Sequence, residues 1–398
     1  MIQKKEFRII MTIFLIIWLT SGYLVCNDIM PSAVVIGLWV MLMGVSAWNC
    51  KRWNSSEMLA AVFGIAWYLL SCFVNEEPFY RSGATAFAYF VVAVFVASTT
   101  WEDFKRGYLK VMSFLCAVSL GMFFAYMLIP ELSTFNVVYN PAGTPASNMY
   151  IYISHYDRNM GMFWEPGAFQ AFIALALLFV VAERNLDFWK IVLFVATIIT
   201  TFSTTGYIGV ALIFVLLLFR WQSIGKKIRR WIIWGGVPLL VLFLYMSMDS
   251  LFDTRGNSTF GKLITYNERG GFENDYAGGS VGIRVNAVVK PIETFLENPI
   301  FGNGTVGLRD EIFQYTEGMN TCTFVNWFAM FGIVFGIFML RGLRKFSRRV
   351  YPGRTFFVFV FLFIITISEN FATNAFFFML ALYGFKARLK KQAARYRR

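Results

Sequence analysis

Apolar runs of membrane-spanning length recur along almost the whole chain, separated by short polar or basic segments. A helix needs about 20 apolar residues to cross the hydrocarbon core of a membrane. The chain of 398 residues is 58% hydrophobic and only 15% charged, whereas soluble domains contain about 25% charged residues. This pattern predicts an all-α polytopic membrane protein with about twelve transmembrane helices. The predicted spans are 7–25, 31–48, 58–74, 83–99, 108–129, 167–182, 188–204, 206–221, 231–248, 321–340, 355–368 and 371–385.

Two apolar stretches are too long or too interrupted to form one helix each. The stretch 188–221 contains the polar tetrapeptide Ser203-Thr-Thr-Gly206, which is typical of a turn. The stretch 355–385 is interrupted by Ser368-Glu-Asn370. We therefore expect two helices in each stretch.

Lysine and arginine residues gather on one side of the predicted bundle. With the N-terminus placed inside, 28 of the 36 Lys and Arg residues fall in inner segments. Loops rich in these residues face the cytoplasm. The bias predicts a multi-pass protein of the cytoplasmic membrane with both termini in the cytoplasm. It also accounts for the formal charge of +13 without a nucleic-acid partner.

Metal and nucleotide chemistry find little support in the sequence. The five Cys residues are scattered without metal-ligand spacing. His155 is the single histidine, which excludes a site built from several histidines. There is no Gly-rich nucleotide-binding loop. We expect neither a metal nor a cofactor.

The predicted single membrane domain, 1–398, carries two long outer loops at 130–166 and 249–320. The second is 72 residues long and holds six of the eight outer cations, namely Arg255, Lys262, Arg269, Arg284, Lys290 and Arg309. A long loop between two spans usually carries a functional surface. Arginine can bind a phosphate through two parallel hydrogen bonds. The alternative is that these cations are simply solvated.

The second loop contains a predicted short amphipathic helix that begins near Gly282 and ends before Asn298-Pro299. Arg284 shares a helical face with the apolar residue Val288, and a cation on an apolar face is costly unless it is paired. Arg284 is therefore a candidate anion ligand. The alternative is an interfacial helix whose arginine extends to the membrane surface.

The first loop ends in a cluster of polar residues directly before a predicted span. Glu165 precedes Pro166, which suits the first position of a helix, so the carboxylate of Glu165 could serve as a helix cap. The functional alternative places Arg158 and Glu165 beside an outer site, with Arg158 on a phosphate and Glu165 on a hydroxyl group.

Several of these motifs together resemble the Wzy-type O-antigen and exopolysaccharide polymerases of the O-antigen ligase/polymerase superfamily. The segment 158–167 is similar to the family pattern RxxGxFxEPG, and 298–304 follows Arg284 in the family order. The turn at Ser203–Gly206 and the Gly-rich segment from Thr321 lie where the family has two further elements. The resemblance covers roughly residues 155–340.

The resemblance implies a GT-C-like fold and a metal-independent glycosyltransferase that uses a lipid-diphosphate donor. Such a polymerase joins polyprenyl-diphosphate-linked oligosaccharide repeats at the outer face of the bacterial inner membrane, in O-antigen, capsule or exopolysaccharide synthesis. The implied partners are the lipid-linked donor and acceptor and membrane lipid, with a chain-length regulator as a further partner of the pathway. Arg158 and Arg284 are the first candidates for the diphosphate, and Arg255, Arg269 and Arg309 are weaker ones.

Glu165 is the first candidate for a carboxylate that activates the acceptor hydroxyl. His155, Thr204 and Thr205 are further candidates: His155 is the only histidine, and one of the two threonines stands where the family turn has an arginine. Ligases of the superfamily carry a histidine near the position of Thr321 and Cys322, and its absence here favours a polymerase.

Two other functions remain open at this stage. One is an O-antigen ligase that transfers the glycan to a lipid or protein acceptor. The other is a flippase for lipid-linked sugars or another transporter, which would place ionisable residues within its spans. A purely structural membrane protein would not need the 72-residue outer loop.

Overall fold

A computed structural model of the chain describes residues 2–48, 55–155, 157–183, 185–219, 279–316, 321–367 and 369–387. The described chain is mostly helical. Its helices are α1 (Ile2–Ser21), α2 (Tyr23–Cys26), α3 (Ser32–Trp48), α4 (Ser55–Val74), α5 (Phe79–Ser98), α6 (Trp101–Leu128), α7 (Pro166–Ala182), α8 (Phe188–Thr200), α9 (Thr204–Phe219), α13 (Gly279–Glu297), α14 (Gly304–Thr316), α15 (Thr323–Val350), α16 (Thr355–Ile365) and α17 (Ala375–Phe385).

The helices agree with the predicted polytopic membrane protein. Within the described residues, α4, α5, α6 and α15 are long and apolar enough to cross a membrane, and six shorter helices are also apolar. Both split stretches contain two helices each, α8 with α9 and α16 with α17. The predicted span 231–248 lies outside the described residues, so the count of twelve stays a prediction.

The expectation of an all-α chain was wrong for the first outer loop. This loop holds a 3₁₀ turn (Pro130–Thr134) and a three-stranded antiparallel sheet of β1 (Val137–Tyr139), β2 (Pro145–Asn148) and β3 (Ile153–Ser154). Ser147 of β2 is paired with residues of both neighbouring strands. Strands of two to four residues are too short to give the alternating pattern by which strands are recognised in a sequence.

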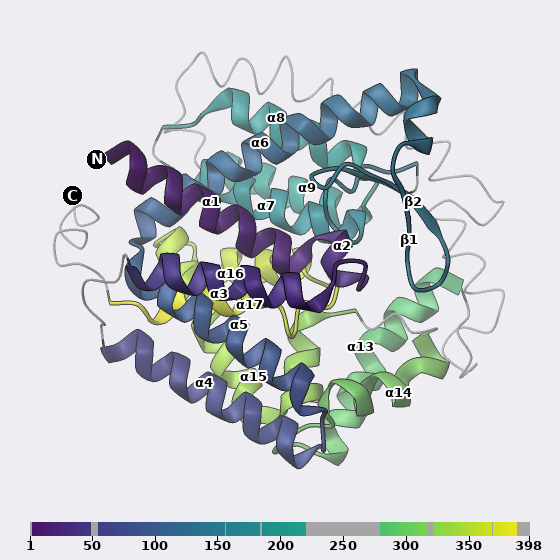
Figure 1. Cartoon of the computed structure of the whole chain (residues 1–398). Coiled ribbons are helices and arrows are strands. Elements are labelled where there is room, and N and C mark those ends of the chain that lie inside the picture. The colour runs from purple at the N-terminus through teal and green to yellow at the C-terminus, as the bar shows by residue number, and fades with distance from the viewer. Residues whose placement is uncertain are drawn as a thin grey trace.

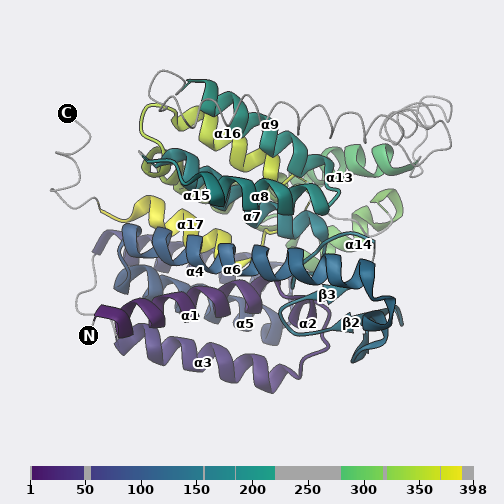
Figure 2. The same cartoon turned by 90° about the horizontal axis from the view of Figure 1, so that it is seen from above.

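The helices pack side by side as a bundle, with α7 and α17 in its interior (Figures 1 and 2). Almost every residue of α7 is buried, so α7 is apolar on all sides, as a fully enclosed helix should be. Aromatic rings fill the space between α6, α7 and α17. The ring of Tyr108, for example, lies 5.5 Å from that of Phe179 and 5.5 Å from that of Phe376.

The two ends of the bundle differ in character. The helix α1 begins and α17 ends on the left of Figure 1, whereas the small sheet, α13 and α14 lie at the right. We call these the inner and the outer end, after the predicted orientation. Ion pairs tie helices together at the inner end, among them Lys5–Asp103 at 3.0 Å and Lys110–Glu6 at 2.7 Å.

The turn after α13 docks into a kink in α15. Gly332 interrupts α15 with φ 77° and ψ 177°, a conformation open almost only to glycine. The kink lets Ile333 donate its backbone N–H to the carbonyl of Pro299 at 2.8 Å, and Asn303 donates to the carbonyl of Ala329 at 2.8 Å. A Cβ atom at position 332 would overlap the carbonyl oxygen of Ile300. The predicted stop at Asn298-Pro299 is thus where α13 is fixed to the bundle.

Gly332→Ala is expected to destabilise the protein by more than about 2 kcal/mol, because it combines backbone strain with a clash against backbone atoms. The matched control is Gly44→Ala in α3, where a Cβ atom meets nothing within 4 Å and alanine is favoured in a helix. The midpoint of thermal unfolding of the purified protein in detergent measures both. Equal midpoints for the two variants would contradict the docking described here.

Candidate functional site

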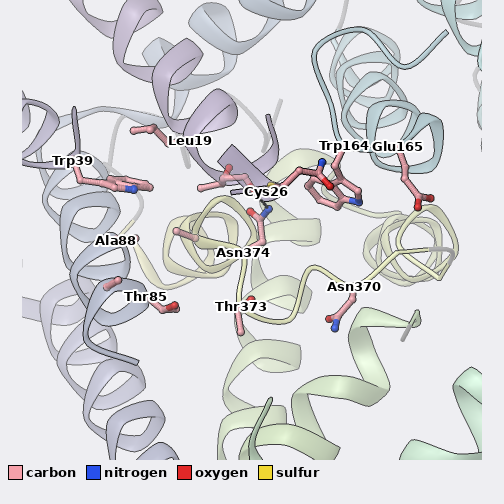
Figure 3. A pocket seen from close by; sticks show the side chains of 14 residues that line it. Leu19, Cys26, Trp39, Thr85, Ala88, Trp164, Glu165, Asn370, Thr373 and Asn374 are labelled. Carbon is pink, nitrogen blue, oxygen red and sulfur yellow. Dashed lines mark hydrogen bonds between the residues drawn. The ribbon is translucent and has the colours of Figure 1, made fainter. Parts of the chain in front are cut away.

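An open cavity of about 480 Å³ lies among the outer ends of the helices. It is lined from α1, α3 and α5, from the segment before α7 and from the segment before α17 (Figure 3). Side chains with hydroxyl, amide and carboxyl groups share this wall with two tryptophans: Thr20, Asn27, Thr85, Glu165, Asn370, Thr373 and Asn374, with Trp39 and Trp164. Polar groups that form hydrogen bonds beside flat aromatic rings suit a carbohydrate ligand.

The segment 158–161 is anchored to the outer end of α8. Arg158 donates from Nε to the carbonyl of Thr201 at 2.9 Å and from its guanidinium to that of Phe202 at 3.0 Å. The buried side chain of Asn159 donates to the hydroxyl of Thr200 at 2.9 Å. A helix leaves its last carbonyls without partners, and Arg158 supplies donors just beyond the end of α8. Arg158 therefore has a positioning role on the backbone in this structure.

The next residues lead the chain to the cavity. Gly161 has φ +55°, and the rings of Phe163 and Phe169 stack with centroids 5.0 Å apart. Tyr23 donates its backbone N–H to the carbonyl of Met162 at 2.8 Å, which joins this segment to the break between α1 and α2. These contacts fix the direction in which Trp164 and Glu165 leave the chain.

Glu165 occupies the N-cap position of α7, with Pro166 as the first helical residue. Its side chain accepts no capping hydrogen bond. Its backbone carbonyl accepts the N–H of Phe169 at 3.1 Å. The carboxyl group instead lies at the cavity (Figure 3). The sequence left a capping role and a site role open, and this geometry agrees with the second.

Glu369 is the residue of this region that the sequence analysis missed. It lies between α16 and α17 and is only 6% exposed. Trp164 donates its indole N–H to Oε2 of Glu369 at 3.1 Å, and Oε1 packs so closely on Gly167 that a Cβ atom there would overlap it. The sequence did contain a signal for Glu369, because it is an acidic residue inside an apolar stretch. Burying such a residue in a membrane protein costs free energy, and it usually has a function.

The two carboxyl groups interact. Partial burial raises the pKa of Glu165 above its ordinary value, opposed by the positive charge of Arg158, a hydrogen bond from Glu369 and the charge of His155. The side chain of Glu165 remains accessible through the cavity, although the surrounding protein removes part of its water.

The other predicted site residues are distributed differently. His155 contacts the carbonyl of Pro145 through Nδ1 at 2.9 Å. Thr204 and Thr205 begin α9 near the carbonyls that Arg158 binds. Arg309 is exposed on α14 and pairs with Asp310 at 3.1 Å, and it does not line the cavity. Arg255 and Arg269 lie outside the described residues.

Arg284 lies in the first turns of α13, as predicted, although its side chain is outside the described part of the structure. The predicted apolar face of this helix is largely exposed, with Ile292 at 43% and Leu296 at 68%. The opposite face, with Ala287 and Thr294, is buried in the protein. An exposed apolar face on a surface helix suits contact with lipid.

A comparison with protein families identifies part of the chain. Residues 189–326 match the family model described as O-Antigen ligase. This segment is similar to the O-antigen ligases, and it covers about a third of the chain. The match runs from α8 through α9, α13 and α14 to the start of α15. It confirms the resemblance to the O-antigen ligase/polymerase superfamily, whose activity is ligase- or polymerase-type glycosyl transfer from lipid-linked glycans. A search of curated proteins finds no match.

The match covers only part of the candidate site. The turn between α8 and α9 and Arg284 lie inside the matched segment. The segment from Arg158 to Gly167 lies before it. Hydrogen bonds from Arg158 to Thr201 and Phe202 join the two parts.

Arg158→Gln is expected to raise the pKa of Glu165 further, because the charge of Arg158 is the largest influence that lowers it. A carbodiimide reacts with protonated carboxyl groups, so mass spectrometry of labelled protein across a pH series follows the titration of Glu165. The pH of half-labelling should lie above about 4.3, the usual glutamate value, and should move upward in Arg158→Gln.

Arg309→Gln is the matched control for this titration, because it removes a cation that is paired elsewhere. It should leave the half-labelling pH of Glu165 unchanged. A downward movement in Arg158→Gln, or equal movements in both variants, would exclude the stated electrostatic coupling.

Proposed function

We propose that this protein is a polysaccharide polymerase. It transfers a growing glycan from polyprenyl diphosphate to a hydroxyl group of the next lipid-linked repeat, at the outer face of the cytoplasmic membrane. The observation that carries the proposal is the carboxyl group of Glu165 at the wall of an open cavity lined by polar and aromatic side chains. The neighbouring Trp164 is held by the buried Glu369. The match to the O-antigen ligase family supports the same class of reaction.

The proposed reaction needs a base and a place for negative charge. The deprotonated carboxylate of Glu165 accepts the proton of the acceptor hydroxyl. At the same time the oxygen of that hydroxyl forms a bond to the anomeric carbon of the donor. The bond from that carbon to the diphosphate oxygen breaks, and polyprenyl diphosphate leaves with the electron pair. A base contributes most when its pKa lies near the working pH, and the raised pKa of Glu165 supports this role.

Cations at the outer end would stabilise the diphosphate. Arg158 and Arg284 remain the proposed ligands, with Arg255 and Arg269 as further candidates. Arg158 already donates to two carbonyls, so its proposed share is charge and positioning near Glu165. The ion pair of Arg309 with Asp310 does not favour a role in diphosphate binding. The proposed mechanism uses no metal.

The segment around Thr321 favours a polymerase over a ligase. The resemblance places the histidine of ligases at this position, where this chain has Thr321, Cys322 and Thr323. Thr323 donates its hydroxyl to the carbonyl of Glu369 at 2.7 Å and accepts the N–H of Phe371 at 2.9 Å. Its hydroxyl is therefore used to hold the segment before α17.

Glu165→Gln is expected to lower polymer formation at least about 100-fold, as the loss of a general base does. Cells that lack the gene, complemented with each variant, are scored by the ladder of glycan chain lengths on a gel. Single repeats on the final acceptor are expected with Glu165→Gln. A ladder of wild-type length from well-expressed Glu165→Gln would contradict the proposed role of Glu165 as a base.

Two controls make this experiment specific. Arg309→Gln should retain the wild-type ladder, because Arg309 lies on the exposed surface of α14. Deletion of the gene separates the two family activities: loss of a polymerase leaves single repeats on the acceptor, whereas loss of a ligase leaves polymer on the lipid carrier. Accumulated lipid-linked polymer would identify a ligase.

A further inference from the structure

A second cavity, of about 370 Å³, lies at the inner end of the bundle, far along the helices from the candidate site. It is lined by Lys345, Arg348 and Arg349 of α15, and by Gly384 and Lys386 at the end of α17. Four of these five lining residues are cations, and none is an acid. We propose that this cavity binds the phosphate group of an anionic membrane phospholipid. The proposal is independent of the reaction at the outer end.

The close crossing of α15 and α17 builds this cavity. Gly384 packs so tightly on α15 that a Cβ atom there would overlap the carbonyl of Gly342. Small residues allow helix backbones to approach closely in membranes. The last turn of α15 and the end of α17 are thereby held together, and their cationic side chains converge. The cavity is therefore formed by packed elements of the bundle.

Two of the four cations are fixed by the protein. Arg349 is 8% exposed and donates to the carbonyl of Lys386. Lys386 pairs with the buried Glu57 of α4 at 3.2 Å and also donates to the carbonyl of Ala97 at 3.3 Å. Lys345 and Arg348 are exposed, and the ammonium group of Lys345 lies 4.6 Å from the ring centre of Phe385.

The position along α15 selects a lipid as the source of this phosphate. Ile333 and Ile337 are 41% and 51% exposed, and the same helical face continues with Arg341, Lys345 and Arg348 at spacings of three and four residues. An exposed apolar stripe that becomes basic at one end marks the passage from lipid tails to headgroups.

Exposed aromatic residues mark the same level on neighbouring helices. Trp48 ends α3, Trp189 lies in the first turn of α8 and Phe356 in the first turn of α16, and each is at least 78% exposed. All three lie at the inner end. Aromatic residues gather at the level of the headgroups, so the cavity lies where phospholipid phosphates lie. Basic pockets between helices at this level are suited to anionic headgroups.

The test uses the purified full chain in neutral detergent, with phosphatidylglycerol, phosphatidylcholine or inorganic phosphate added. Native mass spectrometry counts bound lipid, and thermal unfolding reports stabilisation. Phosphatidylglycerol should bind and raise the unfolding midpoint, whereas phosphatidylcholine and inorganic phosphate should not. A midpoint raised equally by inorganic phosphate would overturn the assignment to a lipid.

The variant Lys345→Gln/Arg348→Gln should bind phosphatidylglycerol about 30-fold more weakly, as expected for two cations near a membrane. The matched control Lys4→Gln/Arg8→Gln removes the same charge from exposed positions of α1 at the same end. It should keep wild-type affinity. Equal losses in both variants would mean general attraction and would overturn the site.

A third variant guards against misfolding. Lys345→Arg/Arg348→Lys keeps the charge and should keep phosphatidylglycerol binding. If Lys345→Gln/Arg348→Gln already unfolds at a lower temperature without lipid, the charge-conserving variant is used to test the site. Loss of binding in a stable charge-conserving variant would also exclude a phosphate site.

Discussion

The carboxyl group of Glu369 is the polar centre on which the outer end depends. A buried carboxyl group is tolerated only where hydrogen bonds replace its water. Trp164 supplies one to its side chain, and Thr323 donates to its backbone carbonyl. Through these contacts the segment between α16 and α17 is joined to the start of α7 and to the start of α15. The absence of a side chain at Gly167 allows this approach.

The candidate site is built from helix ends that are distant in sequence. Arg158 joins the first outer loop to the end of α8, and Tyr23 joins it to the break after α1. Glu165 then faces a cavity whose opposite wall is formed by α3 and α5. In a bundle of membrane helices, the helix ends lie near the membrane surface. Short segments between helices can therefore act on a lipid headgroup without a separate domain. Glu369 lies in one of these connecting segments, which agrees better with a site at the membrane surface than with a transport path through the bundle.

The sequence predicted the helices well because membrane spans follow from local composition. Apolar runs and polar interruptions predicted that each of the two long stretches contains two helices, but the boundaries differ. α9 already begins at Thr204, α16 ends at Ile365 and α17 begins at Ala375. The short sheet of the first loop was not predictable, because its strands are held by contacts such as that of Ser147 with Tyr126 at 2.6 Å and not by pattern. The position of Glu165 at a cavity needed the structure, since no sequence rule separates a capping carboxylate from one that faces a cavity.

Glu369 and Arg158 show that the sequence does not reveal the contacts of a side chain with residues far along the chain. Glu369 was visible as a charge within an apolar stretch, yet its partner Trp164 is 205 residues away. Arg158 was predicted to bind an anion, and the structure shows that it also donates to two backbone carbonyls. In both cases long-range contacts decide the role of the side chain. The kink at Gly332 is likewise explained by a long-range contact, because the turn after α13 packs against it.

The central claim is that this chain alone joins lipid-linked repeats. The most direct measurement is the reaction of the purified protein, reconstituted in lipid vesicles, with a polyprenyl-diphosphate-linked oligosaccharide as sole substrate. The account predicts glycans of increasing length and release of one polyprenyl diphosphate for each new linkage. Release or transfer that occurs only after a different lipid or protein acceptor is added would contradict it and would indicate a ligase.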